Sequence, residues 1–279
     1  MSASTGTTLR ADGLSGPPPT DPWRRYRPWW RVIGSIVAVV MLLGGVVRVI
    51  GVLAERDEPV DQVIDAAALD TLDVRLRDSD VEVVGADVDD VTITGTVTSG
   101  LRRSDFRAEP RDGRVLVTLG CGRWQAFHDC SADLRIEVPR DLAVTIDAPN
   151  SELTLRDLGG AVDAGSTNSS MSVVGLSGPV RLRATNASVE AVGLRATDVD
   201  IETSNDDVRA EFDVAPESVV IRSTNAAATV VVPDTHDFYR LQLSTSNAGT
   251  NAEVRSDPDS DRVLQVTTSN DDIVVRYPD

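Results

Sequence analysis

Two pairs of adjacent carboxylates are the first candidates for chemistry in this sequence of 279 residues. Asp206 and Asp207 follow one Thr-Ser-Asn triplet, and Asp271 and Asp272 follow a second copy of it. Paired acids could act as acid and base in a polysaccharide lyase or hydrolase, or as oxygen ligands of a weak calcium site. The alternative is that all four are solvated acids in turns. The choice depends on how far apart the fold places the two pairs.

The chain has two cysteines, Cys121 and Cys130, with His128 between them. A metal site made from these three residues lacks a fourth ligand and a standard spacing. A disulfide closing a short loop is favoured, and it would stabilise the fold by roughly 2–3 kcal/mol in the chain-entropy model. The loop is a candidate partner-binding segment, and its side chains are Arg123, Trp124, Gln125, Phe127 and His128. Alternatively, its aromatic rings cover an open end of the fold.

Seven asparagines recur through the second half of the chain at a slowly lengthening interval. They are Asn150, Asn168, Asn186, Asn205, Asn225, Asn247 and Asn270. The intervals of 18, 18, 19, 20, 22 and 23 residues are typical of a solenoid. Positions six and four before each asparagine, and three and five after it, are apolar or small, with Thr250 as the polar exception. A period of two in each arm indicates strands that face a core on one side.

Each coil therefore reads as strand, corner, strand and variable turn, which predicts an all-β fold: a parallel β-solenoid with two main strands per coil of 18–23 residues. Parallel crossovers are right-handed by default. Asparagine suits the corner because it tolerates a left-handed backbone, and stacked amides can bond to one another as a structural ladder. A row of ligand-binding amides is the alternative. In sequential stacking, the two acid pairs lie three coils apart, about 14 Å at 4.8 Å per coil, too far to act together.

The N-terminal part predicts a membrane anchor. Residues 1–22 are rich in Ser, Thr, Gly and Pro and form a disordered cytoplasmic tail. Residues 23–54 combine an aromatic and basic flank with an apolar run of about 34 Å if helical, enough to span a bilayer. Because arginines precede the run and acids follow it, we expect a single-pass helix with a cytoplasmic N-terminus and an extracytoplasmic solenoid. A cleaved signal peptide is the competing interpretation.

The remaining chain divides by regularity. Residues 55–68 are expected to be an acidic linker, 69–140 irregular opening coils and a cap, and 141–279 the regular coils. The segments 101–113 and 121–130 are expected to be excursions from the opening coils. The chain has a net charge of −17, and residues 1–54 hold six arginines against two aspartates, which leaves −21 for the rest. This charge argues against nucleic acid as a partner.

Several segments resemble a bacterial family of β-helical surface domains known as the "putative adhesin" family. They are residues 134–142, Leu158-Gly159-Gly160, 231–233 followed by Phe238-Tyr239, and 268–275. The resemblance covers about residues 69–279, although a glycine commonly fills the corner position in that family. It implies a solenoid on the cell surface, behind a single membrane helix, with an adhesive or envelope-sensing role.

Together these observations predict a membrane-anchored, non-enzymatic surface module that needs no cofactor. Weak calcium binding at the turn acids is the one cofactor interaction that stays open. Its expected partners are the membrane through the single helix, and a cell-wall polymer or a surface protein through the solenoid. Two alternatives stay open at this point. One is a carbohydrate-active β-helix, and the other is a transmembrane sensor that signals through the short basic tail.

Overall fold

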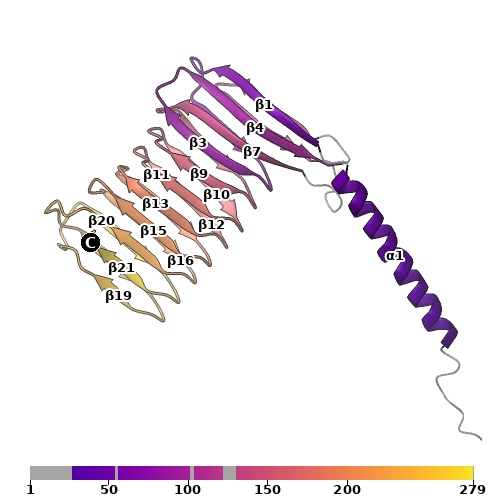
Figure 1. Cartoon of the computed structure of the whole chain (residues 1–279). Helices are drawn as coiled ribbons and strands as arrows, with labels where there is room; N and C mark the ends of the chain where they lie inside the picture. Colours follow the sequence, from indigo (N-terminus) through magenta and orange to yellow (C-terminus); the bar gives the residue numbers. More distant parts are fainter. Residues whose placement is uncertain (1–26, 54–55, 101–103, 122–129, 279) are drawn as a thin grey trace, which may run out of the picture. The chain divides into compact units, whose positions relative to one another are not determined.

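The computed structural model describes residues 27–53, 56–100, 104–121 and 130–278, and the chain divides into two units after Val49 (Figure 1). The first unit holds most of helix α1 (Arg27–Leu53), within the segment 23–54 for which a helix is predicted. Among the residues that the structure describes, no helix combines the length and the apolarity that crossing a membrane requires. The predicted cytoplasmic tail, residues 1–22, lies outside the described residues.

The second unit consists of two long sheets with a shared interior. In spatial order, the eleven-stranded sheet contains β1 (Arg56–Asp65), β4 (Asp90–Ser99), β7 (Cys130–Pro139), β3 (Asp80–Ala86), β9 (Glu152–Arg156), β11 (Met171–Val174), β13 (Val189–Leu194), β15 (Val208–Phe212), β17 (Ala228–Val231), β21 (Ile273–Arg276) and β19 (Thr250–Ala252). The ten-stranded sheet contains β18 (Arg240–Ser244), β20 (Val263–Thr267), β16 (Ser218–Ser223), β14 (Asp198–Thr203), β12 (Val180–Thr185), β10 (Val162–Thr167), β8 (Ala143–Asp147), β2 (Thr71–Arg75), β6 (Arg114–Gly120) and β5 (Asp105–Arg111).

The prediction of an all-β fold with parallel strands is confirmed. Corresponding strands of neighbouring coils pair in parallel and in the expected register, so that Val162 lies beside Val144 and Val180. The alternating positions assigned to the interior are buried throughout the central coils, from Val144 to Val230. Among the residues that the structure describes, the core lies between Val60 and Tyr277. Residues 56–278 therefore contain a hydrophobic core of their own.

The coils at the C-terminal end do not stack in sequence order. Strand β20 lies between β16 and β18, and β21 lies between β17 and β19. The last coil of the chain thus fits between the two coils that precede it, and residues 240–252, here called the terminal coil, form the end of the stack. The expectation of sequential stacking is wrong at this point. Thr250 is exposed because it belongs to the outermost coil, where the interior ends.

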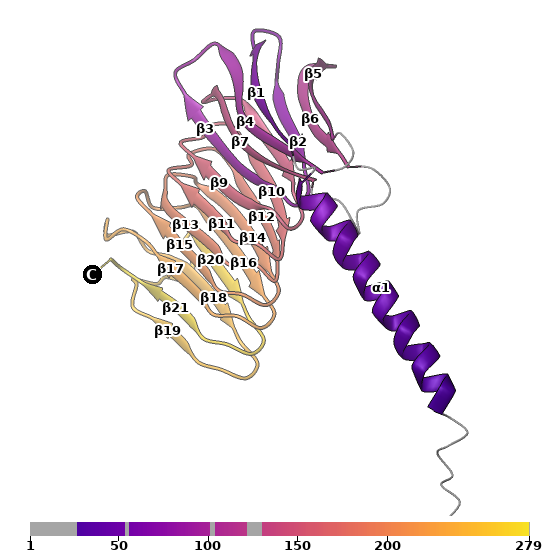
Figure 2. The ribbon, with the colours of Figure 1, turned by 45° about the vertical axis from the view of Figure 1, so that its right-hand side comes forward.

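The coils at the N-terminal end are also stacked out of sequence order. The coil of β2 and β3 lies between the coil of β6 and β7 and the coil of β8 and β9. Outside it, β1 and β4 extend one sheet in antiparallel pairing, and β5 extends the other (Figure 2). The antiparallel strands are the irregular cap that was expected within 69–140, but part of it comes from residues upstream of that range.

Two segments that were expected to be irregular are strands. Residues 55–68 are not a linker, because β1 pairs with β4 over ten residues from Arg56 to Asp65. Val60 and Ile64 pack against the core, whereas the acids of the strand face outward and hide the alternation in the sequence. Pro59 is tolerated because β1 is an edge strand. The segment 101–113 likewise contains β5 and is only partly an excursion.

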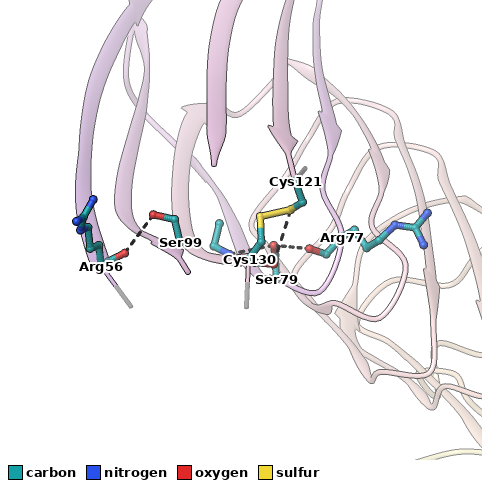
Figure 3. Close-up of a disulfide and its surroundings, with 7 residues drawn as sticks. Arg56, Arg77, Ser79, Ser99, Cys121 and Cys130 are labelled. Carbon is teal, nitrogen blue, oxygen red and sulfur yellow. Dashed lines mark hydrogen bonds between the residues drawn. A yellow bond between two sulfur atoms is a disulfide. The ribbon is translucent and has the colours of Figure 1, made fainter. Parts of the chain in front are cut away.

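The predicted disulfide is confirmed. Cys121 follows β6, Cys130 opens β7, and the two Cα atoms lie 6.0 Å apart (Figure 3). Beside it, the buried Ser79 hydroxyl accepts a hydrogen bond from the Ala132 amide (3.1 Å) and donates one to the Arg77 carbonyl (2.9 Å). The disulfide joins the start of β7 to the end of β6 in the same coil, and Ser79 ties β7 to the neighbouring coil of β2 and β3.

One buried hydroxyl group should make the stability of the fold depend on pH above pH 10. Tyr239 is completely buried, its hydroxyl has no hydrogen-bond partner among the described residues, and burial raises its pKa to about 12. Well below pH 10 the phenol is neutral in the folded and unfolded chains alike. As pH rises from 10 to 12, the unfolded chain ionises first, so we expect stability to fall by about 2 kcal/mol.

Tyr239→Phe removes this ionisation and the unpaired hydroxyl together. We expect the variant to be at least as stable as the wild type at pH 7. Between pH 10 and 12 it should lose about 2 kcal/mol less stability than the wild type, because it has no phenol to ionise. Urea unfolding at pH 7, 10 and 11.5 measures both effects. Parallel pH profiles for the two proteins would contradict the assignment.

Candidate functional site

The seven asparagines lie in one stack and bond to one another. After Asn150, each side-chain Nδ2 donates to the Oδ1 of the preceding amide in space, as from Asn168 to Asn150 (2.8 Å) and from Asn225 to Asn205 (2.9 Å). The other bonds run from Asn186 to Asn168, Asn205 to Asn186, Asn270 to Asn225 and Asn247 to Asn270. Each bond within the stack uses an amide donor and an amide acceptor. This arrangement supports the structural role of the ladder over the ligand-binding alternative.

The ladder begins on a residue that the sequence pattern does not include. Asn150 donates to the Oδ1 of Asp78 (3.0 Å), which occupies the corner of the preceding coil in space. Asp78 has φ 54°, and Asn150, Asn168 and Asn186 have φ 57°, 61° and 51°. The left-handed backbone predicted for the corner is thus present at Asp78 and at three of the seven asparagines, and the prediction is wrong for Asn205, Asn225, Asn247 and Asn270. An asparagine repeat does not reveal Asp78, because only its backbone conformation and its acceptor oxygen match the pattern.

The paired turn acids have structural partners. Asp207 accepts a hydrogen bond from the Ala227 amide (3.1 Å), and Asp272 accepts one from the Gly249 amide (2.8 Å), each in the next coil of the stack. Because the last coil is inserted, the two pairs lie two coils apart, about 10 Å, and not the three coils expected from sequence order. Within the described ranges, no group of three or more His, Cys, Asp or Glu side chains is placed to hold a metal ion.

The candidate partner-binding loop lies outside the described residues. This applies to all five of its side chains: Arg123, Trp124, Gln125, Phe127 and His128. Only its two ends are described, at Cys121 and Cys130, where the disulfide joins them.

The outer face of the ten-stranded sheet brings together polar side chains that are far apart in the sequence. In-register parallel pairing places one outward residue from each coil in the same row, and one such row contains Thr145, Asp163, Arg181, Asp200 and Val220. The period of two in the sequence places these positions on the outward side of their strands. It does not reveal the rows, because a row exists only once the register between coils is known.

Ion pairs connect side chains of different coils, both within a row and between rows. Arg183 Nη1 lies 2.7 Å from Asp163 Oδ1. Asp200 is shared between Arg222 (3.0 Å) and Arg181 (3.6 Å). All these side chains are partly exposed, so each pair adds little to stability. Their main effect is to hold long side chains in fixed positions on the face of the sheet.

Two adjoining depressions form a groove on this face. Their volumes are about 360 Å³ and 460 Å³, and both are lined by Thr145 and Asp163. The floor is low because small residues point outward, among them Ala143 and Gly165. A Cβ atom added to Gly165 would lie 3.8 Å from the nearest backbone atom, which is ordinary contact. A side chain at this position would therefore occupy the groove without disturbing the sheet.

The lining favours recognition by hydrogen bonds and charge. Carboxylates come from Asp147, Asp163, Asp198 and Asp200, guanidinium groups from Arg181 and Arg183, and hydroxyls from Thr71, Thr145, Thr167, Thr185 and Ser218. None of the residues that line the two depressions is aromatic. With four acids against two arginines, the groove suits a polar ligand that is neutral or carries positive groups.

Comparison with known proteins gives neighbours by structure alone. No protein-family model and no curated protein matches the sequence. A "putative cell adhesion protein" from Clostridium sporogenes is 10% identical, with 79% of this chain and 100% of that chain covered and a TM-score of 0.31. A "putative adhesin" from Parabacteroides merdae is 9% identical (80% and 97% covered, TM-score 0.35), and a "putative lipid binding protein" from Parabacteroides distasonis is 10% identical (80% and 97% covered, TM-score 0.30).

Proposed function

We propose that this chain is a membrane-anchored, extracytoplasmic β-solenoid that binds a cell-wall polymer or a surface protein without transforming it. The observation that carries the proposal is the groove on the outer face of the ten-stranded sheet. It crosses several coils whose strands are paired on both sides, so its lining is held in place before a ligand arrives. Preorganisation of this kind favours binding because few side chains have to lose conformational freedom when the ligand binds.

Three features support the anchored and extracytoplasmic location. Disulfides such as Cys121–Cys130 persist in oxidising compartments outside the cytoplasm. Helix α1 exposes large apolar side chains, including Met41 (72%) and Leu42 (69%), which a bilayer would cover. The arginines before the helix favour a cytoplasmic N-terminus.

The ion pairs of the groove support a binding role. Asp163 and Asp200 both have arginine partners within 3.6 Å. These contacts hold both carboxylates in fixed positions on the face of the sheet, where they can accept hydrogen bonds from a polar ligand.

The test is a screen of residues 56–279 against glycans, cell-wall fragments and surface proteins, together with turnover assays. For any ligand found, Gly165→Val should weaken binding about tenfold or more by filling the groove, with an unchanged Tm. Ser172→Val, which places the same side chain on the outer face of the other sheet, is the control and should bind normally. Equal binding by Gly165→Val would place the ligand elsewhere, and product formation would refute the non-enzymatic role.

A further inference from the structure

The edge strands at the two ends of the solenoid differ in their charges and in their proline content. The two sheets have four edges: β1 and β5 at the N-terminal end, and β18 and β19 at the C-terminal end. Edge strands expose unpaired backbone groups, and proteins commonly protect them with charges and proline. Strand β1 carries five charged residues and Pro59, and β5 carries Pro110 among alternating charges. The N-terminal edges are therefore protected against further pairing.

The C-terminal edges lack this protection. The terminal coil, residues 240–252, contains Arg240 as its one charged residue and has no proline, in a chain with net charge −17. Leu241 and Leu243 are only half-buried, and Thr250 and Ala252 are exposed. The equivalent positions of the next coil inward, such as Leu264 and Val266, are fully buried. The interior of the solenoid thus ends at a surface that no described residue covers.

The unpaired backbone groups of the terminal coil can be assigned. The Arg240 amide and the Ser244 carbonyl both bond toward β20, so the intervening Leu241 and Leu243 direct their N–H and C=O groups outward. On the other strand, the Gly249 carbonyl and the Glu253 amide bond toward β21. Thr250 and Ala252 therefore direct their backbone groups outward as well. Within the described part of the chain, each edge thus offers two residues with free donors and acceptors, spaced by one residue.

We propose that the terminal coil pairs with the terminal coil of a second copy of this chain, tail to tail about a twofold axis. Antiparallel pairing centred on Gln242 would set Leu241 of each copy against Leu243 of the other. Pairing centred on Asn251 would do the same for Thr250 and Ala252. In both cases the facing residues are those with outward backbone groups, as hydrogen-bonded antiparallel pairs require.

One axis can serve both strands. Gln242 lies five residues before the corner Asn247 and Asn251 lies four after it, each midway between the two inward residues of its arm. The centres of the two edges therefore lie at similar distances from the corner. The result is an isologous interface, in which the same surface of each copy meets itself.

A second copy fits this surface better than a single extended peptide. A peptide strand can pair with β18 or with β19, whereas a second solenoid end pairs with both and continues the interior past Leu241 and Leu243. The charge pattern agrees, because acidic copies repel each other least where acids are absent. Residues 240–252 are such a segment.

The test is the mass of residues 56–279 by sedimentation equilibrium over a range of concentrations. We expect a monomer–dimer equilibrium that Thr250→Pro weakens about tenfold or more in Kd, because proline removes an outward N–H from an exposed position. Thr250→Val keeps that N–H and should dimerise at least as well. Circular dichroism and Tm verify that both variants are folded.

A wild-type protein that stays monomeric at all concentrations would overturn the proposal. So would a dimer that Thr250→Pro leaves unchanged, because the contact would then lie elsewhere. Gly165→Val should dimerise normally, which separates this interface from the groove.

Discussion

Gly178→Ala is expected to lower the free energy of unfolding by about 3 kcal/mol or more. A Cβ atom at this position would lie 2.3 Å from the Gly160 carbonyl oxygen and 2.4 Å from that of Gly159. Both contacts are with backbone, which cannot rotate away as a flexible side chain can. Gly160 in turn would place a Cβ 2.3 Å from the Leu142 carbonyl oxygen. The turns of successive coils thus approach so closely that only glycine fits.

Gly165→Ala is the matched control, because its added methyl group meets only ordinary contacts at 3.8 Å. We expect it to change stability by no more than about 0.5 kcal/mol. Urea unfolding of residues 56–279, monitored by circular dichroism, compares the two variants. Equal stability of Gly178→Ala and the wild type would mean that the turns can separate without cost.

Leu182→Ala is expected to cost about 2–5 kcal/mol by opening a cavity. Leu182 is fully buried in β12 and lies in register between Ala164 and Ile201. Ala164 is too short to fill the space, and both neighbouring strands are held by their own pairing. The site has little capacity to collapse, which favours the upper part of the range.

Leu243→Ala removes the same atoms from the terminal coil. Leu243 is only half-buried in the monomer, so we expect a loss of about 1 kcal/mol. The same urea titration, at a concentration where the protein is monomeric, measures both variants. Similar losses for the two leucines would contradict the placement of residues 240–252 at the end of the stack.

The repeat predicted the interior of the coils but not their order. Every coil has the same pattern, so the pattern cannot distinguish neighbours in space from neighbours in sequence. One residue carried a signal: Thr250, the polar exception, belongs to the coil that lies outermost. Strand β1 was missed for a different reason, since its exposed acids obscure the alternation of Val60 and Ile64.

The groove could not be predicted because it depends on relations between coils. Asp163, Arg181 and Asp200 are ordinary outward residues when each strand is considered alone. The register places them side by side, and the pairing of Asp163 with Arg183 follows from it. In the sequence alone, a small outward residue such as Gly165 is only a weak strand former. Its place in the floor of the groove follows from its neighbours in the adjacent coils.

The insertion of the last coil has a consequence for biosynthesis. Strands β18 and β19 pair only with β20 and β21, which are made later. Before residues 263–276 are available, the terminal coil lacks its native neighbours, and β16 and β17 are unpaired on the side that β20 and β21 later occupy. The C-terminal end of the stack therefore reaches its native order only when these last two strands are present. A chain that ends prematurely cannot complete this end, however well the rest has folded.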